Sequence, residues 1–78
     1  MDKQVITLIN REELFVDKVK TIDEFVDDFL EISCEDGIID VEGEELKIEE
    51  FINESGKIKV IGKIDGIFYK KTKQKKKR

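Results

Sequence analysis

The densest group of potential metal ligands lies in one short acidic segment. Asp23, Glu24, Asp27 and Asp28 carry the carboxylate oxygens that Ca²⁺ and Mg²⁺ prefer. Their spacing does not match a calcium-binding loop, because no Asp-x-Asp-x-Asp-Gly run is followed by a glutamate six residues later. We therefore interpret the segment as a solvated acidic face, and we expect neither a metal site nor a cofactor.

The side chains needed for common kinds of catalysis are missing or too sparse. The 78-residue chain has no histidine, so it cannot form a Ser-His or Cys-His nucleophile pair. Paired carboxylates can hydrolyse glycosides, but a chain this short lacks the material for a sugar-binding cleft. The single cysteine, Cys34, cannot form an intrachain disulfide and is expected to be a buried structural thiol. We predict that the protein is not an enzyme and assign no catalytic residue.

Charge divides the chain into two parts. Residues 1–69 hold all 19 acidic groups and 8 basic ones, a net charge of −11, whereas residues 70–78 hold seven cations and no anion. We predict a compact acidic domain over residues 1–69 and a basic tail over residues 70–78. The tail supplies the candidate anion- or partner-binding residues, which are Lys70, Lys71, Lys73, Lys75, Lys76, Lys77 and Arg78.

The basic tail could bind several kinds of ligand. A dense run of cations can bind nucleic-acid phosphates, anionic lipid headgroups or an acidic protein surface, including the acidic domain of the same or a neighbouring subunit. Tyr69 is the only aromatic residue close enough to support base stacking, so a nucleic-acid interpretation depends on charge alone. A purely solubilising role is the remaining interpretation.

Alternation of apolar and polar residues predicts an all-β fold. Val5–Ile9 and Leu14–Val16 flank a polar turn and predict a hairpin. The same alternation recurs around Ile32, Ile39 and Ile58, and no proline interrupts it. We expect a small antiparallel sheet or sandwich of about six to seven short strands.

The Asp36-Gly37 pair predicts a two-residue type I′ turn and a definite register. We expect Ile32, Cys34, Ile39 and Val41 to share one buried face. The predicted cross-strand pairs are Cys34 with Ile39, Ile32 with Val41, and Leu30 with Gly43.

Three segments are less regular. Asp65-Gly66 predicts either a second hairpin turn or a bulge within one long strand from Lys57 to Lys70. Apolar residues have helical spacing in two other places, which predicts one or two short helical turns there. These sets are Ile22, Phe25, Val26 and Phe29, and Ile48, Phe51 and Ile52.

The small size of the chain favours association. A core in a chain this short contributes only roughly 3–5 kcal/mol, and Ile38, Ile61 and Phe68 fall outside the core alternation. We expect self-association through sheet edges or an apolar patch, or docking on a partner. No apolar run approaches the ~20 residues of a membrane span, and the first residues do not resemble a signal peptide, so a cytoplasmic location is expected.

The order and spacing of these motifs resemble the YabP/YqfC family of sporulation proteins over residues 5–70. The resemblance begins at Asn10-Arg11-Glu12, and Lys18 occupies a position where the family is expected to have glycine. The central and closing motifs are Leu30-x-Ile32-x-x-x-x-Gly37-x-Ile39-x-Val41-x-Gly43 and Gly56-x-Ile58-x-Val60-x-Gly62-x-Ile64.

This resemblance implies a small, non-enzymatic, β-rich protein that acts in assembly of the spore envelope, either cortex or coat. It implies a homo-oligomer or the partner of a membrane-associated sporulation protein, on the mother-cell or forespore side of the spore membranes. The alternative from charge alone is a small β-sheet protein that binds nucleic acid through residues 70–78.

Overall fold

The computed structural model describes residues 3–71, which form one antiparallel six-stranded sheet. The strand order is β1-β2-β6-β5-β4-β3, so β1 and β3 are the two edges. The all-β prediction is confirmed, whereas the one or two helical turns are wrong, because residues 3–71 contain no helix. The strands are β1 (Ile6–Ile9), β2 (Glu13–Val16), β3 (Val19–Val26), β4 (Phe29–Cys34), β5 (Gly37–Ile52) and β6 (Lys57–Lys70).

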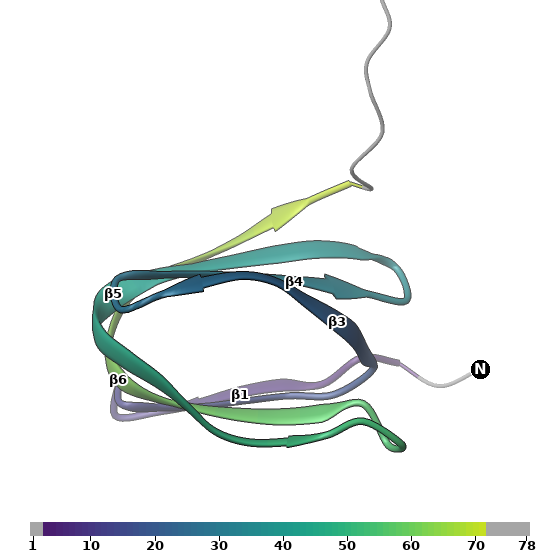
Figure 1. The fold of residues 1–78 in the computed structure, drawn as a ribbon, viewed down its shortest axis with the longest axis horizontal. Helices are drawn as coiled ribbons and strands as arrows, with labels where there is room; N and C mark the ends of the chain where they lie inside the picture. Colours follow the sequence, from purple (N-terminus) through teal and green to yellow (C-terminus); the bar gives the residue numbers. More distant parts are fainter. Residues whose placement is uncertain (1–2, 72–78) are drawn as a thin grey trace, which may run out of the picture.

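The two long strands allow this single sheet to form two layers (Figure 1). The first part of β5 pairs with β4 in one layer, and the first part of β6 pairs with β2 in the other. Backbone hydrogen bonds also join the layers at their margins: the Val19 N–H donates to the Gly56 carbonyl and the Leu46 N–H to the Asp27 carbonyl, each at 2.8 Å. The result is a small sandwich made from one bent sheet.

Glycine permits a close backbone approach between β5 and β6 at the bend. A Cβ added to Gly43 would lie 2.0 Å from the Lys63 carbonyl oxygen. Gly62 has a φ of 136°, and a Cβ there would lie 2.6 Å from the Glu45 carbonyl oxygen. No other residue type fits this backbone approach without displacing one of the strands.

Aliphatic side chains fill the space between the two layers. Ile32, Cys34, Ile39 and Val41 all belong to this buried cluster, which confirms that they share one face. The remaining buried members are Leu14, Val16, Val19, Leu30, Leu46, Ile58, Val60 and Ile64.

The predicted β4–β5 register is wrong by two residues. Ile32 faces Ile39 instead of Val41, and Cys34 faces Gly37. The chain reverses at residues 35 and 36, neither of which has the positive φ that a type I′ turn requires. Gly37 instead opens β5, where an added Cβ would lie 2.8 Å from the Lys70 carbonyl oxygen. Because a two-residue shift preserves side-chain direction, the buried face is unchanged.

The second Asp-Gly pair lies inside one strand. Glu42 pairs with Gly66 and Gly43 pairs with Ile64, so Asp65 is the extra residue of a bulge. Of the two interpretations of Asp65-Gly66, the long strand with a bulge is confirmed.

Bulges also explain the helical spacing that misled the sequence prediction. In β3 the register shifts between Val19 and Thr21 and again between Ile22 and Glu24. Each bulge adds a residue, so side chains on one face recur every three residues instead of every two. Val19, Ile22 and Phe25 follow that spacing along a strand, and a bulge near the end of β5 has the same effect on the second segment.

Lys18, at the position where the family resemblance expects glycine, adopts the backbone conformation of a turn glycine. Lys18 links β2 to β3 with a φ of 58°, a left-handed conformation that glycine adopts most readily. The carbonyl of Lys18 accepts a hydrogen bond from the Glu35 N–H at 3.1 Å, so the turn is held to the end of β4. A lysine therefore makes the turn that the family resemblance assigns to glycine.

Candidate assembly surface

Five of the eight exposed large apolar side chains among residues 3–71 lie in the two edge strands or directly before β1. Leu8 and Ile9 in β1, with Val5 just before it, are exposed on one edge. Phe25 and Val26 in β3 are exposed on the other. An edge strand also presents unpaired backbone N–H and C=O groups, which are a template for pairing with another chain. Both edges therefore combine exposed apolar side chains with backbone groups that no neighbouring strand pairs within the described residues.

The other side chains expected to form an apolar patch are distributed differently. Ile38 is only 3% exposed, although it lies on the face of β5 opposite the core. Ile61 is half-buried, and Phe68 is exposed near the end of β6. These three residues therefore do not form one exposed patch.

Three charged residues form a cluster on the outer face of β4, β5 and β6. Glu31 and Asp40 are direct cross-strand neighbours, and Glu31 is only 7% exposed. The Lys70 Nζ lies 2.9 Å from Glu31 Oε2 and 3.4 Å from Asp40 Oδ2. Lys70, the first residue of the predicted basic tail, is thus the last residue of β6 and neutralises part of the sheet's own acidity.

The environment of this cluster shifts two pKa values. Burial, followed by the nearby Glu31 carboxyl, raises the pKa of Asp40 above its ordinary value, and Lys70 opposes this shift. The hydrogen bond to Glu31 raises the pKa of Lys70 above its ordinary value. One oxygen of Asp40, Oδ1, is buried without a hydrogen-bond partner. The two carboxylates therefore depend on Lys70 to remain charged side by side.

We predict that Lys70→Gln destabilises the fold at neutral pH and that acid relieves the loss. Without the ammonium, Asp40 and Glu31 repel each other, and the native state binds a proton more tightly than the unfolded chain. Stability of the variant should then rise as pH falls from the raised native pKa of Asp40 toward 3.8, its ordinary value. Urea unfolding across this pH range measures the effect.

The wild type is expected to lose stability at high pH, where Lys70 loses its charge. The native pKa of Lys70 is raised, so its contribution is present below 10.5 and is lost as pH rises through the native pKa. This alkaline loss should be absent from Lys70→Gln and retained in the matched control Lys71→Gln, which changes an exposed residue. Equal behaviour of the two variants would contradict a structural role for Lys70.

The remaining tail candidates are placed as follows. Lys71 is exposed and follows β6 directly. The other five predicted tail residues lie outside the described residues, and these are Lys73, Lys75, Lys76, Lys77 and Arg78.

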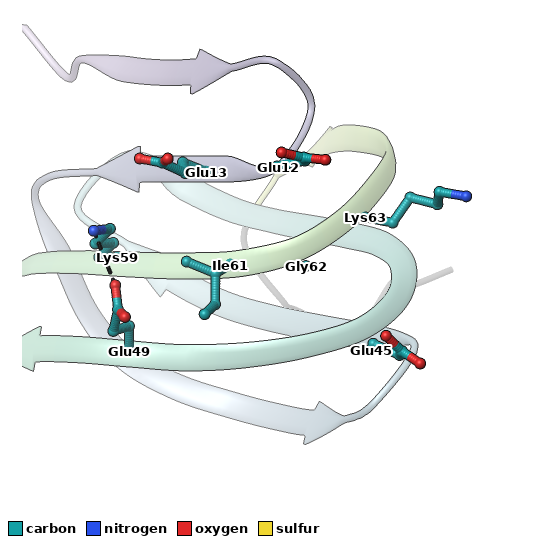
Figure 2. A pocket seen from close by; sticks show the side chains of 8 residues that line it. All are labelled: Glu12, Glu13, Glu45, Glu49, Lys59, Ile61, Gly62 and Lys63. Atoms are coloured by element: carbon teal, nitrogen blue, oxygen red, sulfur yellow. Dashed lines mark ion pairs between the residues drawn. The ribbon is translucent and has the colours of Figure 1, made fainter.

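An acidic groove lies on the outer face of the opposite layer (Figure 2). It has a volume of about 470 Å³, and Lys59 at its side forms an ion pair with Glu49 at 2.9 Å. The same ammonium lies 5.4 Å from the centre of the Phe15 ring. Glu45 and Lys63 point away from the ion pair, so the charges are dispersed. The lining residues are Glu12, Glu13, Glu45, Glu49, Lys59, Ile61, Gly62 and Lys63.

Neither the groove nor the acidic segment of β3 provides a metal centre. Across residues 3–71, no group of three or more Cys, Asp or Glu side chains could hold a metal ion. In the acidic segment, Asp23 accepts hydrogen bonds from the hydroxyls of Thr21 and Ser33. That carboxylate therefore ties β3 to β4.

Cys34 is a buried free thiol beside the core. Burial is the main cause that raises the pKa of the thiol. A raised pKa keeps sulfur protonated at neutral pH and suppresses its nucleophilicity. These properties match the structural role expected for Cys34.

The bent sheet, its two edge strands and its charged outer faces define a small all-β domain. The chain matches the YabP family over residues 1–76 and therefore belongs to it. This confirms the predicted resemblance. No curated protein matches the chain.

Membership in the YabP family suggests a sporulation-associated role. The family is not a known enzyme family. Within residues 3–71 there is no helix with the length and apolarity to cross a membrane.

Sequence reasoning missed the Glu31–Asp40–Lys70 cluster because of the register error. The predicted pairing would place Glu31 opposite Glu42, whereas the observed pairing places it opposite Asp40. The alternation of the sequence could have predicted part of this cluster, because it places the carboxylates of Glu31 and Asp40 on the strand face opposite the core.

Proposed function

We propose that the protein is a non-enzymatic assembly module of the spore envelope, cortex or coat, which acts by binding copies of itself or another protein. Family membership supports the sporulation context. The observation that carries the binding role is an uncharged edge strand, β1, in a chain with 44% charged residues. Edges of this kind are normally blocked unless they are used for pairing.

The proposed site of action is the mother-cell or forespore side of the spore membranes, and the proposed partner other than a second copy is a membrane-associated sporulation protein. A fluorescent fusion of the full chain in sporulating cells tests this directly. We expect the fusion to gather around the forespore, and deletion of the gene to impair the spore envelope while vegetative growth is unchanged. A fusion that stays diffuse throughout sporulation, with a normal envelope after deletion, would contradict the proposal.

Under this proposal the segment after Lys71 is dispensable for assembly. We predict that truncation after Lys71 preserves the fold and the oligomeric state, because every described strand and the Lys70 cluster are retained. Truncation after Tyr69 should lower stability, because it also removes Lys70. Light scattering and urea unfolding of the two truncations measure both effects.

The nucleic-acid alternative predicts a different result from the same truncation. Full-length protein would bind duplex DNA, with affinity falling steeply as salt rises, and the chain ending at Lys71 would lose that binding. Anionic vesicles provide the parallel assay for a lipid-binding tail. Retention of self-association together with the absence of DNA binding would favour the assembly role.

A further inference from the structure

We propose that two copies of this chain pair antiparallel along β1, so that their sheets join into one continuous sheet with Thr7 of each copy at the two-fold axis. This inference rests on the proposed function, which identifies β1 as the binding edge but leaves its partner and the register of pairing undefined. It follows from four features of β1: its lack of protection, the direction of its backbone, the pattern of its side chains and the charge of its surroundings.

The two edges of the sheet differ in their protection. β3 contains two bulges and the charged residues Lys20, Asp23 and Glu24. Bulges and charges are the usual devices that prevent another strand from pairing with an edge. Residues 5–9, which include β1, contain no charge and no proline, and the β1–β2 register is unbroken. β1 is therefore the edge left open for pairing.

The backbone of β1 presents hydrogen-bonding groups outward. The Asp17 N–H donates to the Val5 carbonyl at 3.3 Å, and the Val5 N–H donates to Asp17 Oδ1 at 2.7 Å. Val5 thus directs its backbone groups toward the end of β2. Because these directions alternate along an antiparallel strand, Ile6 and Leu8 direct their N–H and C=O groups away from β2. A second strand can bond to both residues without disturbing the existing ladder.

Symmetry and side-chain pattern select one register. A two-fold axis perpendicular to a continuous sheet keeps each residue on the same face in both copies, so a residue at the axis faces its own counterpart. Thr7 is the centre of the uncharged run 5–9. With Thr7 at the axis, Ile6 pairs with the second copy's Leu8, and Val5 pairs with its Ile9.

This register covers the apolar side chains that are exposed on β1. Val5 is 58%, Leu8 40% and Ile9 48% exposed in the single chain. Each of the three gains an aliphatic cross-strand neighbour from the second copy, and apolar cross-strand pairs are the main stabilising contacts of a sheet. The pattern is complementary to itself, which identifies another copy of this chain as the occupant.

Charge restricts where two copies can meet. Residues 1–69 carry a net charge of −11, so most approaches of two domains are repulsive. Pairing through residues 5–9 places no acidic side chain opposite another. At the ends of the paired segment Lys3 comes opposite Arg11, and both are exposed to screening by salt. Salt should therefore strengthen this dimer, whereas it would weaken a dimer held by the basic tail on an acidic domain.

Disulfide trapping with Thr7→Cys in the full chain tests the register. Facing residues in a non-hydrogen-bonded antiparallel pair have Cα atoms about 4.5 Å apart, within the range of a disulfide. We expect mild oxidation to trap a Thr7→Cys dimer. The matched control is Thr21→Cys, which places an exposed thiol on the other edge, β3, and should not be trapped. The wild type, whose single thiol Cys34 is buried, provides the blank.

A second pair of variants tests the edge without a cross-link. Thr7→Lys places two ammonium groups opposite each other at the axis and should weaken self-association several-fold, whereas Thr21→Lys should leave it unchanged. Circular dichroism of both variants checks that they fold, so that a loss of association is not a loss of structure. Self-association that persists unchanged in Thr7→Lys, with no trapped Thr7→Cys dimer, would overturn pairing through β1 while leaving the proposed function intact. If the wild type stays monomeric but still gathers around the forespore, the proposal that a second copy is the partner is wrong, whereas the proposed function stands.

Discussion

Val41→Asp is expected to unfold the domain at neutral pH. Val41 is completely buried and faces Leu30 on β4 and Ile67 on β6. An unpaired carboxylate there costs several kcal/mol, which is comparable to the roughly 4–12 kcal/mol of stability expected for a domain of this length. Far-UV circular dichroism and urea unfolding measure the loss.

The matched control for this prediction is Lys47→Asp, which introduces the same side chain at an exposed position of the same strand. We expect that variant to remain folded with a change in stability within about 0.5 kcal/mol. A soluble Val41→Asp protein with the unfolding midpoint of the wild type would contradict the buried face of β4, β5 and β6.

Gly43→Ala is expected to destabilise the fold by about 2–4 kcal/mol, because it affects the bend that makes two layers from one sheet. The new methyl group would lie 2.0 Å from the Lys63 carbonyl oxygen, and that oxygen belongs to the backbone of the neighbouring strand. Neither strand can move without disturbing the pairing of β5 with β6. The midpoint of urea unfolding is the appropriate measurement.

Gly66→Ala separates this backbone clash from a general effect of replacing glycine. The three atoms nearest its added Cβ all belong to the Phe68 ring, the closest at 2.7 Å, and that exposed side chain can rotate away. We therefore expect a small effect from Gly66→Ala and a large one from Gly43→Ala. Equal effects of the two substitutions would show that the close approach at the bend is not a constraint on the fold.

Side-chain direction was easier to predict from the sequence than strand pairing. Alternation placed Ile32, Cys34, Ile39 and Val41 on one buried face correctly, because that property depends only on local backbone geometry. The pairing depended on assigning a turn to Asp36-Gly37, where the glycine in fact accommodates the Lys70 carbonyl. A contact between residues more than thirty positions apart leaves no local signal in the sequence.

The same limit applies to the candidate site. The uncharged run from Val5 to Ile9 was visible in the sequence, but its position at a sheet edge depends on the long-range pairing of β2 with β6. The predicted basic tail was recognised from charge alone, which did not indicate that Lys70 ends a strand and bridges two carboxylates. Bulges in β3 produced a helical spacing that periodicity cannot distinguish from a helix.

The molar mass of the full chain in solution, measured by size-exclusion chromatography with light scattering at low and high salt, tests the central claim most directly. We expect a dimer of twice the chain mass of 9.1 kDa, with a dimer fraction that increases with protein concentration and with salt. A mass of 9.1 kDa at every concentration and salt condition would contradict self-association through β1. A dimer that dissociates as salt is added would contradict it as well, because that behaviour belongs to the basic tail on an acidic surface.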